Sequence, residues 1–290
     1  MSYQGDLRDI RFVLFDLLQL GDLLGKPPFA ELDRETIEQM LVGAEKFARE
    51  RLAPLNAVGD RQGCSFHEGR VTVPPGFKEA HRAFCDLGFL SANAPAAEGG
   101  MGLPQAVGLA LDELFVSANC AYSNYPALTR AGTNMLRQWG SPEQKERYLP
   151  GLLSGRWQGT MCLTEAGAGS FVGATRCVAR PVPDGGEGCW LLAGEKIFIS
   201  AVNLDMAENV IHFVLARTPG APPGIRGLSL FLVPHLELDG QGEPAGGNDV
   251  KIAGTEEKMG IHGTVTTTLL FGEDGHCAAE LVGPQHEGIK

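Results

Sequence analysis

The sequence is short of positive charge and has no long hydrophobic run. Its 290 residues hold 24 Lys and Arg against 35 Asp and Glu, which gives a formal net charge of −11. Nucleic-acid binding depends on Lys and Arg that neutralise phosphates, so this balance argues against a nucleic-acid partner. The longest apolar stretch, residues 228–233, is interrupted by Ser229 and is too short to span a membrane. Charged residues inside the first twenty positions also argue against a secretory signal peptide.

Cysteines and metal-ligand patterns are also sparse. The seven cysteines form an odd set in which no two are closer than twelve positions, so neither a disulfide framework nor a zinc-binding cysteine pair fits. The seven histidines lack the spacing of metal ligands, and we expect no metal site. Since 43% of the residues are apolar, disorder is excluded. These features predict a reduced, cytoplasmic protein, and the length favours two domains.

Before residue 157, apolar residues recur at helical spacing. Residues 7–18 predict one helix, and a second is expected to begin at the N-cap Asp33 and to end at Pro54. Further helices are predicted over 77–87, with Gly88 as C-cap, and over 106–139, where two are expected. Ser141, followed by Pro142 and Gln144, is a capping box that starts another. Residues 1–157 therefore read as an N-terminal all-α domain.

After residue 158, short β-branched and aromatic runs alternate with turn residues. Strands are predicted over 175–182, 189–193, 196–200, 209–217, 227–233 and 264–271. Clusters of Gly, Pro and Asp at 183–186, 219–224 and 239–248 separate them. Many short strands with such turns indicate a β-barrel or sandwich, and not a parallel doubly wound sheet. The fold class is therefore α+β multidomain, with residues 158–290 as a β-domain.

A glycine-rich stretch, Gly167–Gly173, superficially suggests a dinucleotide-binding fingerprint. That fingerprint requires the glycines to open a helix, whereas residues 174–182 show no helical pattern and lead to Pro181 and Pro183. The spacing is also one residue too long. Two interpretations remain: a turn between strands, or a loop whose small residues let backbone amides approach a phosphate or a ring.

Two segments carry a family resemblance. Met161-Cys-Leu-Thr-Glu-Ala-Gly-Ala-Gly-Ser170, the signature segment, resembles the signature of the acyl-CoA dehydrogenase family, and Gly194-Glu-Lys-Ile-Phe-Ile-Ser200, the second segment, follows at the family's distance. Similar stretches cover nearly the whole chain in order: 92–103, 140–150, 231–234 and 257–263. Residues 9–14 are similar to the branch that includes methylmercaptopropionyl-CoA and long-chain-type dehydrogenases. The resemblance implies an N-terminal helical domain, a middle β-domain and a C-terminal helical domain.

The resemblance also implies an FAD site. Met161, Leu163 and Thr164 are expected to meet the flavin, with the Thr164 hydroxyl and nearby amides at its pyrimidine edge. Gly169 and Ser170 are expected at the pyrophosphate, where a missing side chain permits close approach. The remaining two expected contacts are a ring-stacking Phe198 and a hydroxyl near N5 from Ser200. Residues two positions apart on a strand lie on one face of it and are about 6.6 Å from each other, so Phe198 and Ser200 could both reach one ring. An ordinary alternating strand without a ligand would show the same sequence pattern.

The implied reaction is α,β-dehydrogenation of an acyl-CoA thioester. In the family, a carboxylate removes the α-proton, the β-hydride passes to the flavin, and electrons leave through an electron-transferring flavoprotein. A homo-oligomer is also expected. The family's catalytic glutamate lies in its C-terminal domain, and this chain ends at Lys290, where that domain is expected to begin. No catalytic residue is therefore assigned, Glu165 is expected to be structural, and the chain alone is expected to be inactive.

Two residues of the glycine-rich stretch depart from the family pattern. Ala166 stands where proline is usual, which frees the backbone of a turn, and Phe171 stands where aspartate is usual, which removes an acceptor for the loop backbone. These changes keep an alternative open, a non-catalytic relative that retains the fold as a scaffold. A further alternative is a generic two-domain binding protein whose motif matches are coincidental.

Overall fold

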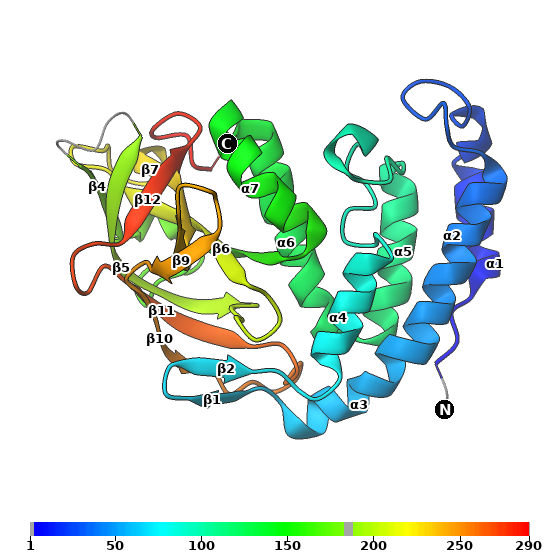
Figure 1. Cartoon of the computed structure of the whole chain (residues 1–290), viewed down its shortest axis with the longest axis horizontal. Coiled ribbons are helices and arrows are strands. Elements are labelled where there is room, and N and C mark those ends of the chain that lie inside the picture. The colour runs from blue at the N-terminus through cyan, green and yellow to red at the C-terminus, as the bar shows by residue number, and fades with distance from the viewer. Residues whose placement is uncertain (1–2, 183–187, 290) are drawn as a thin grey trace. The chain divides into compact units, whose positions relative to one another are not determined.

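The chain forms two compact units, each built from separate stretches of sequence. The computed structural model describes residues 3–182 and 188–289 (Figure 1). Unit 1 contains the residues up to Gly63, together with Pro74–Asn124 and Met259–Gly263. Unit 2 contains Cys64–Val73, Tyr125–Lys258 and the residues from Thr264 onward. The domain boundary at residue 157 stays a prediction.

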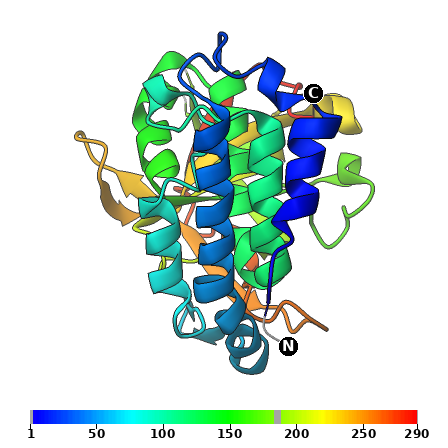
Figure 2. The same cartoon turned by 90° about the vertical axis from the view of Figure 1, so that its right-hand side faces the viewer.

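Unit 1 is a helical bundle around a cluster of aromatic rings. Helices α2, α4 and α5 lie side by side in Figure 2, and their Phe47, Phe84 and Phe115 rings meet at centroid distances of 5.0 to 6.2 Å. Such ring contacts add to the free energy gained by burying apolar area. The helical elements of this part of the chain are α1 (Leu7–Arg11), η1 (Phe12–Leu17), η2 (Leu20–Asp22), α2 (Arg34–Phe47), η3 (Ala48–Leu52), α3 (Ala53–Gln62), α4 (Phe77–Asp86), η4 (Ala96–Glu98), α5 (Gln105–Ala118) and α6 (Cys120–Trp139), the last of which continues into unit 2.

The predicted helix caps are present, and one predicted helix end is wrong. Asp33 accepts a hydrogen bond from the Thr36 amide at 2.7 Å, and Gly88 has a positive φ of 74° after α4. The chain does not leave the helix at Pro54: the π-helical turn η3 leads directly into α3, which has proline in its first turn. Pro54 lies just after this π-helical turn, in the first turn of α3, so the chain stays helical through it.

Unit 2 is built on an eight-stranded sheet with two helices packed on it. The strand order is β10-β11-β5-β12-β7-β6-β3, with β4 beside β5 and β6. The elements are β1 (Ser65–His67), β2 (Arg70–Thr72), α7 (Pro142–Ser154), β3 (Trp157–Cys162), η5 (Val172–Ala174), β4 (Val178–Pro181), β5 (Cys189–Ser200), β6 (Asn209–Arg217), η6 (Ile225–Gly227), β7 (Leu228–Pro234), β8 (Leu236–Leu238), β9 (Pro244–Gly247), β10 (Val250–Thr255), β11 (Thr266–Phe271) and β12 (Ala278–Val282).

The sheet closes on itself as a barrel. Strand β5 pairs with β12, β12 with β7, β7 with β6, β6 with β4, and β4 again with β5. Inside lies a core that includes Cys162, Trp190 and Phe231. The part of α6 in this unit packs closely on β3, since the Gly159 amide donates to Thr129 Oγ1 at 3.1 Å, and the Ser141 capping box starts α7 as predicted. The predicted fold class, helical and β-barrel portions in one chain, is confirmed.

Two of the predicted strands differ from the observed ones in their bounds. Residues 175–177 are not part of a strand, and β4 covers only Val178–Pro181. The two strands predicted over 189–193 and 196–200 are one strand, β5, which passes through Gly194 with φ 145°. A Cβ at Gly194 would lie 2.8 Å from Cys177 Sγ, so only glycine fits this crossing. Residues 183–186, where a turn is predicted, lie outside the described residues.

Candidate flavin-binding surface

The signature segment leaves the sheet through a tight turn. Strand β3 lies parallel to β6 and ends at Cys162, after which Glu165 and Ala168 exchange backbone hydrogen bonds of 3.1 and 3.0 Å across Ala166-Gly167. Residues 169–171 are not helical, and the short 3₁₀ turn η5 follows. The rejection of a dinucleotide fingerprint is therefore confirmed, because no α-helix begins at these glycines.

A buried ion pair joins the signature segment to the second segment. Lys196 Nζ, on β5, lies 2.8 Å from Glu165 Oε1 and donates to the Leu163 carbonyl at 3.0 Å. Lys196 is fully buried, and Glu165 is 9% exposed. A backbone bond of 2.9 Å from the Ile197 amide to the Thr164 carbonyl adds a further link. Two motifs separated by about thirty residues are thereby held side by side.

All the hydrogen bonds described for the Glu165 carboxylate are to donors inside the protein. Besides Lys196, it accepts hydrogen bonds from the Arg176 amide at 2.6 Å and from the Cys177 amide at 3.0 Å. A carboxylate with this many donors is fixed in place and is not directed at solvent. The structural role expected for Glu165 agrees with this geometry.

Phe198 and Ser200 lie at the end of β5, next to a bulge. The register to β11 shifts by one residue between Lys196 and Ile199, and Phe198 takes a positive φ of 60°. Its ring is 57% exposed, whereas the intervening Ile199 is buried. A bulge re-aims a side chain, and a non-glycine residue with positive φ is a strained position that often accompanies function. The bulge therefore presents an aromatic ring at the surface of unit 2.

The remaining predicted residues belong to the signature segment, except for Ser200, which ends β5. Met161, Leu163, Thr164 and Ser200 are partly buried, and Gly169 and Ser170 are exposed. A Cβ added at Gly169 would have open space around it, so backbone there is accessible to a large group. The hydroxyls, the exposed ring and the small residues match the polar edge, the flat ring and the pyrophosphate of a flavin dinucleotide. The donor set therefore fits FAD.

The two residues that depart from the family pattern also lie at the surface. Ala166 is exposed within the turn, and the Phe171 ring is 66% exposed. The loop that follows is held by Arg217, whose guanidinium donates to the carbonyls of Gly173, Thr175, Pro222 and Gly224. Arg217 therefore supplies backbone contacts that fix η5 although no aspartate stands at position 171.

A second buried polar network joins β3, β6 and the residue that follows β7. Thr160 Oγ1 lies 2.7 Å from His212 Nδ1, and His212 Nε2 lies 3.2 Å from His235 Nδ1. Burial lowers the pKa of His235 to about 4 and holds that of His212 well below its usual value. The Cys162 thiol nearby is fully buried, which raises its pKa to about 12 and excludes it as a nucleophile. These side chains are therefore buried hydrogen-bonding groups of the core.

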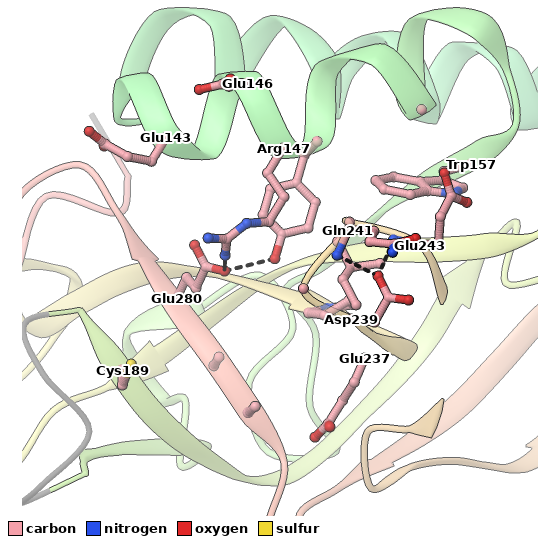
Figure 3. A pocket seen from close by; sticks show the side chains of 18 of the residues that line it. Glu143, Glu146, Arg147, Trp157, Cys189, Glu237, Asp239, Gln241, Glu243 and Glu280 are labelled. Carbon is pink, nitrogen blue, oxygen red and sulfur yellow. Dashed lines mark hydrogen bonds and ion pairs between the residues drawn. The ribbon is translucent and has the colours of Figure 1, made fainter. Parts of the chain in front are cut away.

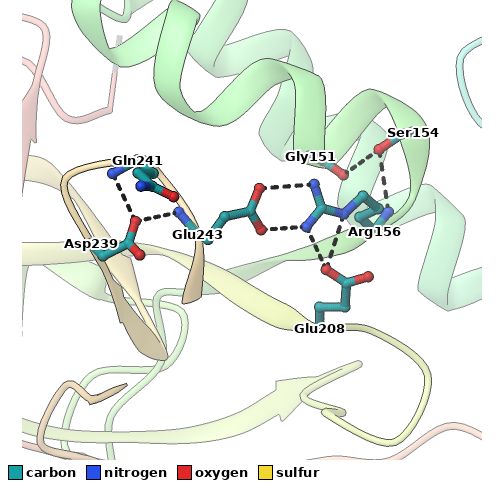
Figure 4. A network of polar contacts seen from close by, with 7 residues as sticks. All are labelled: Gly151, Ser154, Arg156, Glu208, Asp239, Gln241 and Glu243. Atoms are coloured by element: carbon teal, nitrogen blue, oxygen red, sulfur yellow. Dashed lines mark hydrogen bonds and ion pairs between the residues drawn. The ribbon is translucent and has the colours of Figure 1, made fainter. Parts of the chain in front are cut away.

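Unit 2 also contains a cavity of about 990 Å³ between α7 and the β8–β9 hairpin (Figure 3). Its wall carries Glu280, which accepts from Arg147 at 2.8 Å and from the Tyr148 hydroxyl at 2.7 Å. Arg156 ties the hairpin to β6 by pairing with Glu243 and Glu208, both at 2.6 Å (Figure 4). None of the seven predicted cofactor residues, all within the described ranges, lines this cavity. This cavity is therefore not the predicted site.

Within residues 3–182 and 188–289, no group of three or more His, Cys, Asp or Glu side chains could hold a metal ion. In the same ranges, none of the helices combines the length and the apolar character that a membrane crossing requires. The contacts of Lys196 with Leu163 and Glu165 are not predicted from the sequence. The burial of this charged residue on β5 has no local sequence signal.

Comparison with known proteins identifies both halves of the chain. The sequence profile of the acyl-CoA dehydrogenase N-terminal domain matches residues 34–156, and that of the middle domain matches residues 160–273. The 3-methylmercaptopropionyl-CoA dehydrogenase of Ruegeria pomeroyi is 39% identical over the whole chain and 48% of its own length. A broad-specificity linear acyl-CoA dehydrogenase of Mycobacterium tuberculosis is 37% identical, over 99% of the chain and 47% of its own length. The chain thus spans about half the length of these relatives.

Solved structures show the same fold. Butyryl-CoA dehydrogenase from Megasphaera elsdenii matches with a TM-score of 0.67 at 24% identity, over 87% of this chain and 59% of its own. An acyl-CoA dehydrogenase from Bacillus anthracis, solved in complex with FAD, matches with a TM-score of 0.68 at 24% identity, over 89% of this chain and 39% of its own. FAD is the cofactor that the motifs imply for this family. The profiles, the relatives and the fold agree: this chain belongs to the acyl-CoA dehydrogenase family.

Proposed function

We propose that this chain forms the N-terminal and middle domains of an enzyme that dehydrogenates an acyl-CoA thioester with FAD. One observation carries the proposal: the Lys196–Glu165 ion pair and the Ile197–Thr164 backbone bond hold the two flavin motifs of the family in one surface. The motifs are distant in sequence, and an isolated match to either would not require this juxtaposition.

Each predicted residue has a role that its position supports. Phe198 covers one face of the flavin ring, since its own ring is exposed beside the signature segment. The hydroxyls of Thr164 and Ser200 donate hydrogen bonds to polar ring atoms, and Met161 and Leu163 pack on its apolar part. Gly169 and Ser170 leave room for the pyrophosphate. When bound, FAD supplies the hydride acceptor for the β-carbon of the substrate.

The remaining functions are proposed to lie outside residues 1–290. No carboxylate on the signature segment is available as base, because Glu165 is hydrogen-bonded to Lys196 and to two backbone amides. In line with the family resemblance, in which the catalytic glutamate belongs to the C-terminal domain, we propose that the base that removes the α-proton lies beyond Lys290. An electron-transferring flavoprotein as acceptor, a homo-oligomeric assembly and a cytoplasmic location complete the proposal.

The test uses the complete natural polypeptide that contains this chain. We expect it to carry the visible absorption of bound FAD, and we expect anaerobic addition of an acyl-CoA thioester to bleach that absorption, while CoA alone does not. Residues 1–290 alone are expected to show no turnover. Turnover by residues 1–290 alone would contradict the placement of the base.

A non-catalytic scaffold is the second candidate, and the observation that favours it is Phe171. The exposed ring replaces the acidic residue usual in the family at this point of the loop. A complete polypeptide that retains no FAD after incubation with it and removal of the free flavin, and that leaves acyl-CoA thioesters unchanged, would support the scaffold and refute the enzyme.

A further inference from the structure

The buried Lys196 ammonium lies directly behind the proposed flavin surface. It comes from the strand that carries Phe198, and it is fully buried, whereas Phe198 two residues on is 57% exposed. Its donors are directed inward, to the Leu163 carbonyl at 3.0 Å and to Glu165 at 2.8 Å. Lys196 therefore touches the chain that is proposed to touch the flavin, and does not itself face the ligand side.

The bond to the Leu163 carbonyl sets the direction of the next amide. Strand β3 ends at Cys162, so Leu163 and Thr164 lie beyond the last residue paired with β6. In a planar trans peptide, the carbonyl of one residue and the amide of the next point in opposite directions. Because Lys196 draws the Leu163 carbonyl inward, the Thr164 N–H points away from Lys196. One buried cation thereby orients the peptide that is expected at the pyrimidine edge.

The ion pair is better suited to orientation than to stability. A buried ion pair gains little net stability, because desolvation of the two charges offsets their attraction, and uncharged replacements of both partners are often tolerated. What such replacements lose is the direction that the charged groups impose. Here that direction includes the Leu163 carbonyl, and through Glu165 also the amides of Arg176 and Cys177.

We propose that Lys196 is a positioning residue for the cofactor: paired with Glu165, it orients the Leu163–Thr164 peptide and locks it to the strand that carries Phe198. This inference rests on the proposed function. Lys196 acts through its neighbours and is not a catalytic residue.

The test removes both charges together, so that no buried charge is left unpaired. In the complete natural polypeptide, Glu165→Gln with Lys196→Met keeps an acceptor for the Arg176 or Cys177 amide and removes the donor to Leu163. Lys251→Met is the matched control, since Lys251 forms a half-exposed pair with Asp274 at 2.9 Å on β10 of the same unit. We expect the double variant to fold, to bind FAD about tenfold more weakly, a change of about 1.4 kcal/mol, and to shift the visible spectrum of bound FAD. The control is expected to keep the parent values.

A second readout separates this inference from the proposed function. The Ile197 amide donates to the Thr164 carbonyl, so hydrogen exchange at Ile197 reports the lock without any cofactor. We expect faster exchange at Ile197 in the double variant and not in Lys251→Met. If the parent binds no FAD, the proposed function fails, and unchanged Ile197 exchange would then also overturn the positioning role. A folded double variant with parental FAD affinity, spectrum and Ile197 exchange would overturn the inference outright.

Discussion

Strand β3 and the residues that follow it contact two buried polar networks that differ in charge. The Lys196–Glu165 network holds full charges and ends on backbone groups of loops and of the signature segment. The Thr160–His212–His235 network is neutral and lies between paired strands, where Thr160 is opposite His212 in the ladder. Paired strands satisfy their backbone groups in the ladder, whereas the backbone groups of Leu163, Arg176 and Cys177 find their partners in charged side chains. The charged network therefore holds the loop, and the neutral network belongs to the barrel.

The largest effect is expected when the charged network loses one partner. Lys196→Met leaves Glu165 buried without a cation, so the free energy of unfolding should fall by about 3–5 kcal/mol. Urea titration measures this. Lys251→Met, at a half-exposed pair, should change it by less than about 1 kcal/mol. Equal effects of the two substitutions would contradict the difference between the buried and the surface pair.

The neutral network should make stability depend on pH. Burial lowers the pKa of His235 in the folded state to about 4 from 6.5, so the unfolded chain binds a proton first as the pH falls. Stability is therefore full above about pH 6.5, and it declines towards pH 4 by up to roughly 3 kcal/mol for this group. His81 in unit 1, also with a pKa of about 4, contributes in the same direction.

The pH effect can be assigned by substitution. In urea titrations at pH 7 and pH 4.5, His235→Gln should lose less stability on acidification than the parent, and His81→Gln is the matched variant in unit 1. If His235→Gln and the parent lose the same amount of stability, His235 is not buried as a neutral group.

A smaller effect is expected at the exposed aromatic ring. Phe198→Ala removes a side chain that is 57% exposed, so stability should change by less than about 0.5 kcal/mol. FAD binding should weaken about two- to tenfold, because an aromatic contact contributes about 0.5–1.5 kcal/mol. Isothermal titration with the complete polypeptide measures both variants, with Phe171→Ala as the exposed-ring control. The reverse ranking would move the ring contact from Phe198 to Phe171.

The smallest effect is expected in the turn between the two bonds of Glu165 and Ala168. Ala166 occupies the second position of this turn, where proline is favoured. Ala166→Pro should therefore stabilise the protein by about 0.4–1 kcal/mol, because it restricts the unfolded chain. Thermal unfolding measures the change, and a lower melting temperature would show that the turn conformation does not accept proline.

Much of the fold follows from local sequence signals, and the site does so only in part. Asp33, Gly88 and Ser141 mark helix ends because capping depends on neighbouring backbone groups. The helix end predicted at Pro54 is wrong, because a π-helical turn precedes this proline and the chain continues as a helix. Strand β3 was missed, since Trp157–Cys162 is buried on both faces and shows no alternation.

The networks themselves could not be predicted from spacing. Lys196 and Glu165 are 31 positions apart, and His212 and His235 are 23 apart, so only the assembly of the sheet from segments distant in sequence brings them together. The family motifs indicated which residues belong to a flavin site, but not the buried cation that joins them. Long-range burial of a charge has no local signature.

The most direct test of the central claim is hydrogen exchange of the complete natural polypeptide with and without FAD. We expect slower exchange on FAD addition in residues 161–170 and 194–200, and no change in the β8–β9 hairpin beside the cavity of Figure 3. Protection confined to the hairpin or to other segments, with residues 161–170 and 194–200 unchanged, would contradict it.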